Sequence, residues 1–160
     1  MNDRLDARIR TPFAVLGIRA PASSLEEIVC LPLATAPLAP RSSLAERMAR
    51  QVERYLDDPA YRFDLPLCPA GSTFQLRVWR EIARIASGRT RSYGEIAARL
   101  GSAPRPVGGA CRRNPLPLVV PCHRVVGASG LGGFMGGRED FPLSIKRWLL
   151  CHEGVIAPAH

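Results

Sequence analysis

The sequence feature that most constrains the fold is a change of pattern at Pro69-Ala70-Gly71, after which helix-start signals follow one another closely. Residues 72–75 and 92–95 each have the form of a capping box, in which a serine caps the helix and a glutamine or glutamate bonds back to it. Gly88 and Gly101 stand where these two helices should stop. We therefore predict a first domain over residues 1–70 and a helical second domain over residues 71–160.

The first domain has the pattern of a small α/β unit. Apolar residues are concentrated in residues 13–18 and 28–33, on either side of a polar connection, which predicts two short paired strands. Residues 43–46 form a further capping box, and the apolar residues that follow recur every four positions until Asp57-Asp58. This stripe is what a helix packed on a core requires, and we assign no chemistry before residue 70.

The second domain contains a candidate DNA-binding pattern. The short helix predicted to end at Gly101 is followed by a new helix start at Ser102-Ala103-Pro104, with Arg105 at its beginning and Arg112-Arg113 at its end. Two short helices separated by a glycine turn are typical of a helix-turn-helix, although any helical hairpin in a core has a similar pattern.

The rest of the domain leads to one cysteine and then to a last helix. The apolar run 118–120 predicts a buried strand-like segment that leads into residues 121–124, and glycines are frequent after it. A last helix is expected to begin at Pro142 and to be capped by Gly154.

Composition excludes several classes of protein. Hydrophobic residues make up 46% of the chain and charged residues 22%, which is typical of a globular protein. No apolar stretch approaches the ~20 residues of a membrane span, and the first residues lack a secretory pattern, so we expect a cytoplasmic protein with no membrane partner. The five cysteines are widely spaced without a Cys-x-x-Cys pair, so we expect them to be reduced and to bind no metal.

The net charge of +8 lies entirely in the second domain. Residues 1–71 hold 9 basic and 9 acidic side chains, whereas residues 72–160 hold 13 basic and 5 acidic ones. Such an excess favours a polyanionic partner, most commonly nucleic acid. It is equally consistent with a solvated face in an arginine-rich protein, so charge alone leaves both interpretations open.

The segment Pro121-Cys122-His123-Arg124 is the strongest candidate for chemistry, and we predict that Cys122 is an activated thiolate nucleophile. A free thiol has a pKa of about 8.5 and needs a neighbouring imidazole or cation to favour its thiolate. Glu153, near the end of the last helix, is the acid best placed to orient His123. On these residues alone, a buried inert cysteine beside a histidine is equally consistent with the sequence.

From Ser72 to Gly154 the sequence resembles the methylated-DNA–protein-cysteine methyltransferases, a family that repairs O6-alkylguanine. The first domain is similar to the family only in its helix and in residues 63–67. The matching segments are Phe74-Gln75, Val78-Trp79, residues 88–97, Arg105, residues 107–110, Asn114-Pro115, residues 121–126, Gly136-Gly137, Lys146, Leu149-Leu150 and Glu153-Gly154.

The resemblance implies a fold and a reaction. It implies an α/β fold, with a small ribonuclease H-like N-terminal domain and a helical C-terminal domain that carries a winged helix-turn-helix-like motif. It also implies that Cys122 takes the alkyl group from O6-alkylguanine, and from O4-methylthymine, in double-stranded DNA, irreversibly and without a cofactor. The protein is then expected to act as a monomer that flips the damaged base out of the duplex.

The resemblance also implies a role for each matching residue. His123 would take the thiol proton through a water molecule, Glu153 would orient His123, and Asn114 would brace the turn. Tyr93 would rotate the target phosphate, and Arg105 would replace the flipped guanine in the stack. The implied substrate-binding residues are Tyr93, Val125, Phe134, Met135, Gly136 and Lys146. The implied DNA-binding residues are Arg105, Tyr93, Gly94, Gln75, Ser102, Ala103 and Arg112.

Two departures from the family concern the alkyl pocket. Residues 138–145 form a longer segment than in many members, and Phe134-Met135 stands where a tyrosine and a small residue are frequent, so the preferred alkyl size stays open. The cysteine is present, unlike in the alkyltransferase-like proteins. Two alternatives remain: a helix-turn-helix protein that recognises damaged bases without repairing them, and a cysteine hydrolase that uses Cys122, His123 and Glu153.

Overall fold

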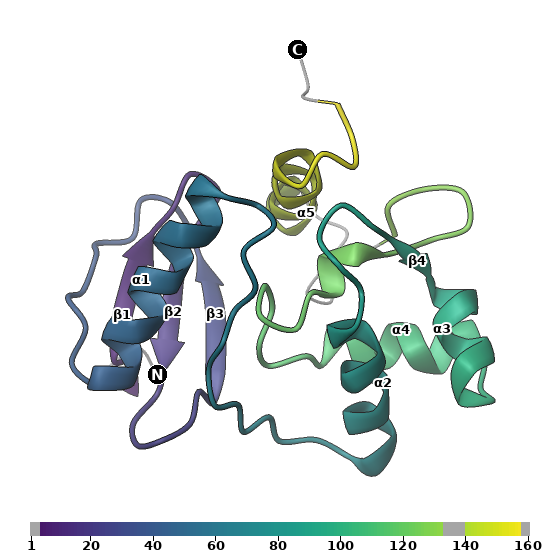
Figure 1. Cartoon of the computed structure of the whole chain (residues 1–160), viewed down its shortest axis with the longest axis horizontal. Helices are drawn as coiled ribbons and strands as arrows, with labels where there is room; N and C mark the ends of the chain where they lie inside the picture. The colour runs from purple at the N-terminus through teal and green to yellow at the C-terminus, as the bar shows by residue number, and fades with distance from the viewer. Residues whose placement is uncertain (1–3, 133–139, 158–160) are drawn as a thin grey trace. The chain divides into compact units, whose positions relative to one another are not determined.

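The computed structural model describes residues 4–132 and 140–157, with the side chains of 140 and 141 outside the description. The chain divides into two compact units, Met1–Ala70 and Gly71–His160. Figure 1 shows strands with one long helix in the first unit and short helices in the second. The overall α/β class is as predicted. Within the described residues, no helix is long and apolar enough to cross a membrane.

The first unit is a three-stranded antiparallel sheet with one helix. The strands are β1 (Ala7–Arg10), β2 (Val15–Arg19) and β3 (Glu27–Leu31), with β2 in the centre. Strands β2 and β3 overlap the two strands predicted at residues 13–18 and 28–33. The sequence analysis missed β1, because two of its four residues are arginines and its apolar pattern is too short to stand out. Pairing with the buried strand β2 holds it in the sheet.

The helix α1 (Ser43–Asp57) confirms the predicted amphipathic helix and its end. Its apolar stripe, including Met48 and Val52, is buried. The predicted cap was one residue too late, because the Ser42 hydroxyl, and not that of Ser43, accepts from the Ala45 N–H, at 3.0 Å. Neighbouring serines compete for a helix start, and only the backbone geometry decides which hydroxyl reaches the third N–H.

The second unit contains α2 (Thr73–Ala83), α3 (Tyr93–Leu100), α4 (Pro104–Arg112) and α5 (Asp140–His152). Both predicted capping boxes are confirmed, with Ser72 paired to Gln75 and Ser92 to Glu95. Gly101, at φ 64°, ends α3 in the left-handed conformation that glycine adopts at least cost. By contrast, α2 ends at Ala83, well before the predicted stop at Gly88.

The helices pack around α4. The Trp79 indole N–H of α2 donates to the carbonyl of Ala110 in α4 at 2.9 Å, and both residues are buried. A small parallel pair, β4 (Arg91–Ser92) and β5 (Val125–Val126), joins the start of α3 to the segment after Cys122. This pair places Arg91 and Ser92, which directly precede Tyr93, beside Val125 and Val126.

The prediction of a strand at residues 118–120 was wrong, because the segment forms a buried turn. Leu118 has a φ of 78°, which is uncommon for a residue with a side chain. The Val120 N–H bonds back to the carbonyl of Leu116 at 2.8 Å. Pro115 and Pro117 lack the N–H groups that a strand ladder requires, and the segment turns instead of pairing in a sheet.

Candidate active site at Cys122

Cys122 begins a 3-10 helix, Cys122–Arg124, and only 5% of its surface is exposed. The Asn114 amide nitrogen donates to the Cys122 sulfur at 3.0 Å and to the carbonyl of Val120 at 2.9 Å. The Asn114 side-chain oxygen accepts from the Leu116 N–H at 2.9 Å. Asn114 therefore binds both sides of the turn before the cysteine and also places a hydrogen-bond donor on the sulfur.

The surroundings of Cys122 favour the neutral thiol in the free protein. The neighbouring Cys111 thiol and burial raise the pKa of Cys122 well above its ordinary value, whereas Asn114 and Lys146 lower it. The resting thiolate expected from the sequence is therefore not the favoured form. Because only the thiolate is a strong nucleophile, the reaction needs a group that takes the proton as the bond forms.

The side chains of His123, Arg124 and Glu153 form a buried ion-pair cluster. The His123 Nε2 atom lies 2.8 Å from Glu153 Oε2, and both side chains are fully buried. Arg124 holds the same carboxylate with two donors, Nε to Oε1 at 2.8 Å and Nη2 to Oε2 at 3.0 Å. It also donates from Nη1 to the carbonyl of Ile85 at 2.7 Å. The predicted orientation of His123 by Glu153 therefore has a direct geometric basis, which Arg124 reinforces.

The second ring nitrogen of His123 is available as a base. Within the described part of the chain, His123 Nδ1 is the only buried side-chain nitrogen or oxygen without a hydrogen-bond partner. Burial lowers the pKa of His123 against the opposing effect of Glu153, so the imidazole is neutral at pH 7. Since Nε2 faces a carboxylate, Nε2 carries the proton and Nδ1 carries the lone pair.

Lys146 is a fully buried cation in α5. Its ammonium donates to the carbonyl of Val125 at 2.7 Å and to the carbonyl of Leu131. Burial lowers the pKa of Lys146 to about 8. Lys146 was predicted to bind substrate, and the structure places its ammonium on the backbone of β5 and of the loop that follows. These hydrogen bonds give Lys146 a part in shaping the segment after Cys122.

The predicted DNA-binding residues lie on the surface of α2, α3 and α4. Tyr93 is half-buried at the start of α3, and a Cβ atom at Gly132 would lie 2.8 Å from its hydroxyl oxygen. Gly132 has a φ of 74°, so a glycine there accommodates both the backbone and the tyrosine ring. The exposed members of the set are Gly94, Ser102, Ala103, Arg105 and Arg112, and Gln75 is half-buried. Phe134, Met135 and Gly136 lie outside the described residues.

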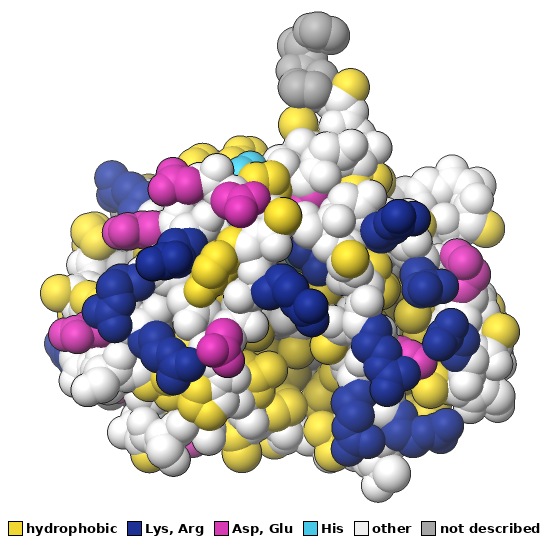
Figure 2. All heavy atoms as spheres, in the orientation of Figure 1, with side chains coloured by type: hydrophobic (Ala, Val, Ile, Leu, Met, Phe, Trp, Pro, Cys, Tyr) yellow, Lys and Arg dark blue, Asp and Glu magenta, His cyan; other side chains and the backbone are white. Residues whose placement is uncertain are grey.

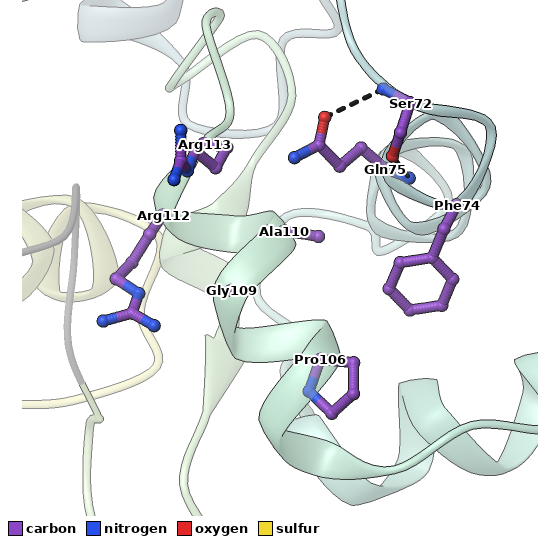
Figure 3. A pocket seen from close by; sticks show the side chains of 8 residues that line it. All are labelled: Ser72, Phe74, Gln75, Pro106, Gly109, Ala110, Arg112 and Arg113. Carbon is purple, nitrogen blue, oxygen red and sulfur yellow. Dashed lines mark hydrogen bonds between the residues drawn. The ribbon is translucent and has the colours of Figure 1, made fainter.

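A groove of about 660 Å³ runs between the start of α2 and α4. Figure 3 shows Phe74 and Pro106 toward one end, the two arginines at the other end of α4, and Gln75 bonded to Ser72. Cys122 does not line this groove. A groove lined by small residues and arginine side chains can bind a negatively charged polymer. Its lining residues are Ser72, Phe74, Gln75, Pro106, Gly109, Ala110, Arg112 and Arg113.

Basic side chains also gather on the outer face of α2 and α3, as Figure 2 shows for the second unit. Arg77, Arg80, Arg84 and Arg99 are exposed there, and Glu81 pairs with two of them. Sequence reasoning named Arg112 but missed the groove, the contact of Cys111 with Cys122 and the pairing of Arg124 with Glu153. Of these three features, only the pairing of Arg124 with Glu153 left a signal in the sequence, which is the adjacency of Arg124 to His123. In the described residues, no three His, Cys, Asp or Glu side chains form a group that could hold a metal ion.

The fold and the site together define a cysteine-based enzyme with a basic helical surface. A family described as "6-O-methylguanine DNA methyltransferase, DNA binding domain" matches residues 73–155. The methylated-DNA–protein-cysteine methyltransferase of Archaeoglobus fulgidus is 43% identical over 116 residues, 72% of this chain and 79% of the relative. The constitutive enzyme of that name from Bacillus subtilis is 44% identical over 104 residues, 61% of this chain and 63% of the relative. The chain therefore belongs to the methylated-DNA–protein-cysteine methyltransferase family.

Solved structures agree with this assignment over both units. The crystal structure of O6-methylguanine methyltransferase from Mycobacterium tuberculosis has a TM-score of 0.79 and 35% identity, and the match covers 96% of this chain and 94% of that one. The Mycobacterium tuberculosis protein in complex with DNA has a TM-score of 0.75 and 32% identity, with 92% of each chain covered. The relationship thus extends to the first unit, where the sequence resemblance was limited.

Proposed function

We propose that this protein repairs alkylated DNA by moving the alkyl group from O6 of guanine to the sulfur of Cys122, once and irreversibly. The observation that carries the proposal is the site itself: a buried thiol bonded by Asn114, beside a neutral histidine whose free nitrogen is Nδ1. Relatives are named methylated-DNA–protein-cysteine methyltransferases, and one solved relative is in complex with DNA.

The transfer needs one base and no cofactor. His123 Nδ1 takes the Cys122 proton through a water molecule, and Glu153 and Arg124 stabilise the imidazolium that forms. The sulfur attacks the alkyl carbon, the S–C bond forms as the C–O bond breaks, and the electron pair passes to guanine O6. The guanine then takes up a proton. Because a thioether has no remaining S–H, Cys122 is not regenerated and each molecule acts once.

The target carbon is inaccessible inside a duplex, so the damaged nucleotide must leave the stack. We assign the rotation of the target phosphate to Tyr93 and the filling of the vacated space to Arg105, which is exposed at the start of α4. Gly108 and Gly109 lie on the same helix, and small residues there permit close approach to a minor groove. In this proposal α3 and α4 form a winged helix-turn-helix-like motif with β4 and β5.

The remaining assignments concern the contacts with the substrate and the DNA, the fold of the first unit, and the state and location of the protein. The backbone near Val125 and Met135 would contact the guanine edge, and Phe134 to Gly136 would line the alkyl pocket. Gly94, Gln75, Ser102, Ala103 and Arg112 would contact the DNA backbone. O4-methylthymine would be a second substrate. We further propose a ribonuclease H-like first unit, a monomer and a cytoplasmic location.

Stoichiometry distinguishes this reaction from the alternatives. We expect dealkylated guanine, measured by chromatography after incubation with O6-methylguanine duplex, to reach one equivalent per protein and then stop. A damaged-base binder would form no product. A hydrolase would continue past one equivalent and leave its protein unmodified, and either result would reject the proposal.

The role of Arg105 has its own test. Arg105→Ala should slow transfer from duplex DNA much more than transfer from free O6-benzylguanine, because only the duplex has a stack to fill. Arg99→Ala is the matched control, since Arg99 is also exposed, one helix earlier, and pairs with Glu81. Equal loss on both substrates would remove Arg105 from this role.

A further inference from the structure

Cys122 lies beside a second thiol for which the alkyl-transfer proposal has no use. Cys111 is in the last turn of α4, and the Cys122 sulfur lies 3.8 Å from the Cys111 carbonyl oxygen. The two thiols are also close enough for each to shift the pKa of the other. The chain has five cysteines, and the two that the structure brings together are the proposed acceptor and its neighbour.

The two thiols differ in access and acidity. Cys122 is buried, whereas Cys111, in the last turn of α4, is only half-buried. The neighbouring Cys122 thiol lowers the pKa of Cys111, burial opposes this effect, and Lys146 adds to it. Oxidation of cysteine follows thiolate character and exposure, so Cys111 is the better first target for a soluble oxidant.

We propose that Cys111 and Cys122 form a reversible disulfide when the protein meets a peroxide. The Cys111 thiolate attacks one peroxide oxygen, the O–O bond breaks, and Cys111 becomes a sulfenic acid with release of one water. The Cys122 sulfur then loses its proton and attacks the Cys111 sulfur, the S–O bond breaks, and the second water leaves. Two thiols are oxidised by two electrons and one peroxide is reduced.

The disulfide has a consequence for an enzyme that acts once. An oxidised Cys122 cannot accept an alkyl group, but a disulfide returns to two thiols on reduction, whereas sulfinic acid does not. Cys111 would therefore keep the acceptor recoverable during oxidative stress. A Cys122 that already carries an alkyl group has no thiol to give, so the alkylated protein cannot form the disulfide.

The experiment treats the whole protein with hydrogen peroxide and maps disulfides by mass spectrometry without reduction. Trypsin cleaves after Arg112 and Arg113, so Cys111 and Cys122 lie in separate peptides that only a disulfide joins. We expect the joined peptide, a loss of two hydrogen masses, and a loss of benzyl transfer from O6-benzylguanine that dithiothreitol reverses. Protein that was benzylated beforehand should give no joined peptide.

Variants separate this proposal from general oxidation. In Cys111→Ser the dithiothreitol-reversible part of the loss should disappear, whereas Cys68→Ser, which removes an exposed cysteine of the first unit, should behave as the parent. Absence of the joined peptide in the parent protein, or the same reversible loss in Cys111→Ser, would overturn the proposal. If Cys111→Ser does not fold, the peptide map of the parent decides. The map does not depend on alkyl transfer, so failure of the proposed repair function would leave it readable.

Discussion

The two units of this protein handle buried polar groups in opposite ways. In the first unit, the buried polar side chains among the described residues are Thr11 and Gln51, both neutral and bonded to nearby backbone groups. In the second unit they are His123, Lys146 and Glu153, all ionisable. Burial of charge costs several kcal/mol per ion, so a fold retains such groups only where partners offset the cost or chemistry requires them.

Cys30 and Cys122 give the same contrast for one residue type. Burial alone raises the pKa of Cys30 to about 12, and no neighbour opposes it. At Cys122, Asn114 and Lys146 oppose the rise, and a base stands next in the sequence. In the first unit, burial by itself keeps the Cys30 thiol protonated and therefore unreactive. In the second unit, burial is combined with groups that favour the thiolate once the proton has an acceptor.

The largest effect should come from the base. His123→Ala should slow transfer from free O6-benzylguanine by about 100- to 10,000-fold, the usual contribution of a general base. The measurement is a single-turnover time course followed by protein mass. His152→Ala is the control, because His152 stacks on Trp148 in α5, and it should keep the parent rate. An unchanged rate in His123→Ala would remove the base from the mechanism.

The second prediction concerns stability. Glu153→Gln should destabilise the second unit by about 3 to 5 kcal/mol, because it leaves a largely buried arginine, with 12% of its side chain exposed, without its counter-ion. Glu81→Gln is the matched control, since Glu81 also has two ion-pair partners, but these are the exposed Arg84 and Arg99. That change should cost below about 1 kcal/mol in urea unfolding. Similar costs at both positions would mean that the buried cluster is no different from a surface one.

The third prediction is a flat pH profile. The pKa of His123 is lowered from 6.5 and that of Cys122 is raised above 9.0, so neutral imidazole and neutral thiol coexist between these values. The rate of transfer from O6-benzylguanine should therefore stay constant from pH 6.5 to about 8, where Lys146 begins to lose its proton, and it should fall at lower pH, where His123 takes a proton. A rate that climbs steadily through this range would instead indicate reaction of a free thiolate without the base.

The smallest effect should appear in DNA binding. Arg112→Ala should reduce the slope of log affinity against log salt concentration by about one, because it removes one phosphate contact. Arg50→Ala removes an exposed arginine from the first unit, whose charges balance, and should leave the slope unchanged. Fluorescence anisotropy with a labelled duplex measures both. Equal slopes for both variants would mean that the basic excess of the second unit is incidental.

Local signals predicted much of the fold. The capping boxes at Ser72 and Ser92 and the glycine at 101 determined helix boundaries because each acts within one turn. Strand β1 and the turn at Leu118 escaped prediction, since one depends on pairing with β2 and the other on a positive φ that is uncommon for leucine. Likewise, the sequence pattern indicated His123 and Glu153 as site residues. The contact of Cys111 with Cys122 depends instead on how α4 packs, which no local pattern encodes.

The most direct test is to locate the alkyl group. After reaction with duplex DNA that contains O6-methylguanine, tryptic peptides should show one added methyl group on the peptide with Cys122 and none on the peptide with Cys111. Cys122→Ala should abolish the added mass, while Cys68→Ser should leave it unchanged. A methyl group on another residue, or a repaired duplex with unmodified protein, would contradict the assignment of Cys122 as the acceptor.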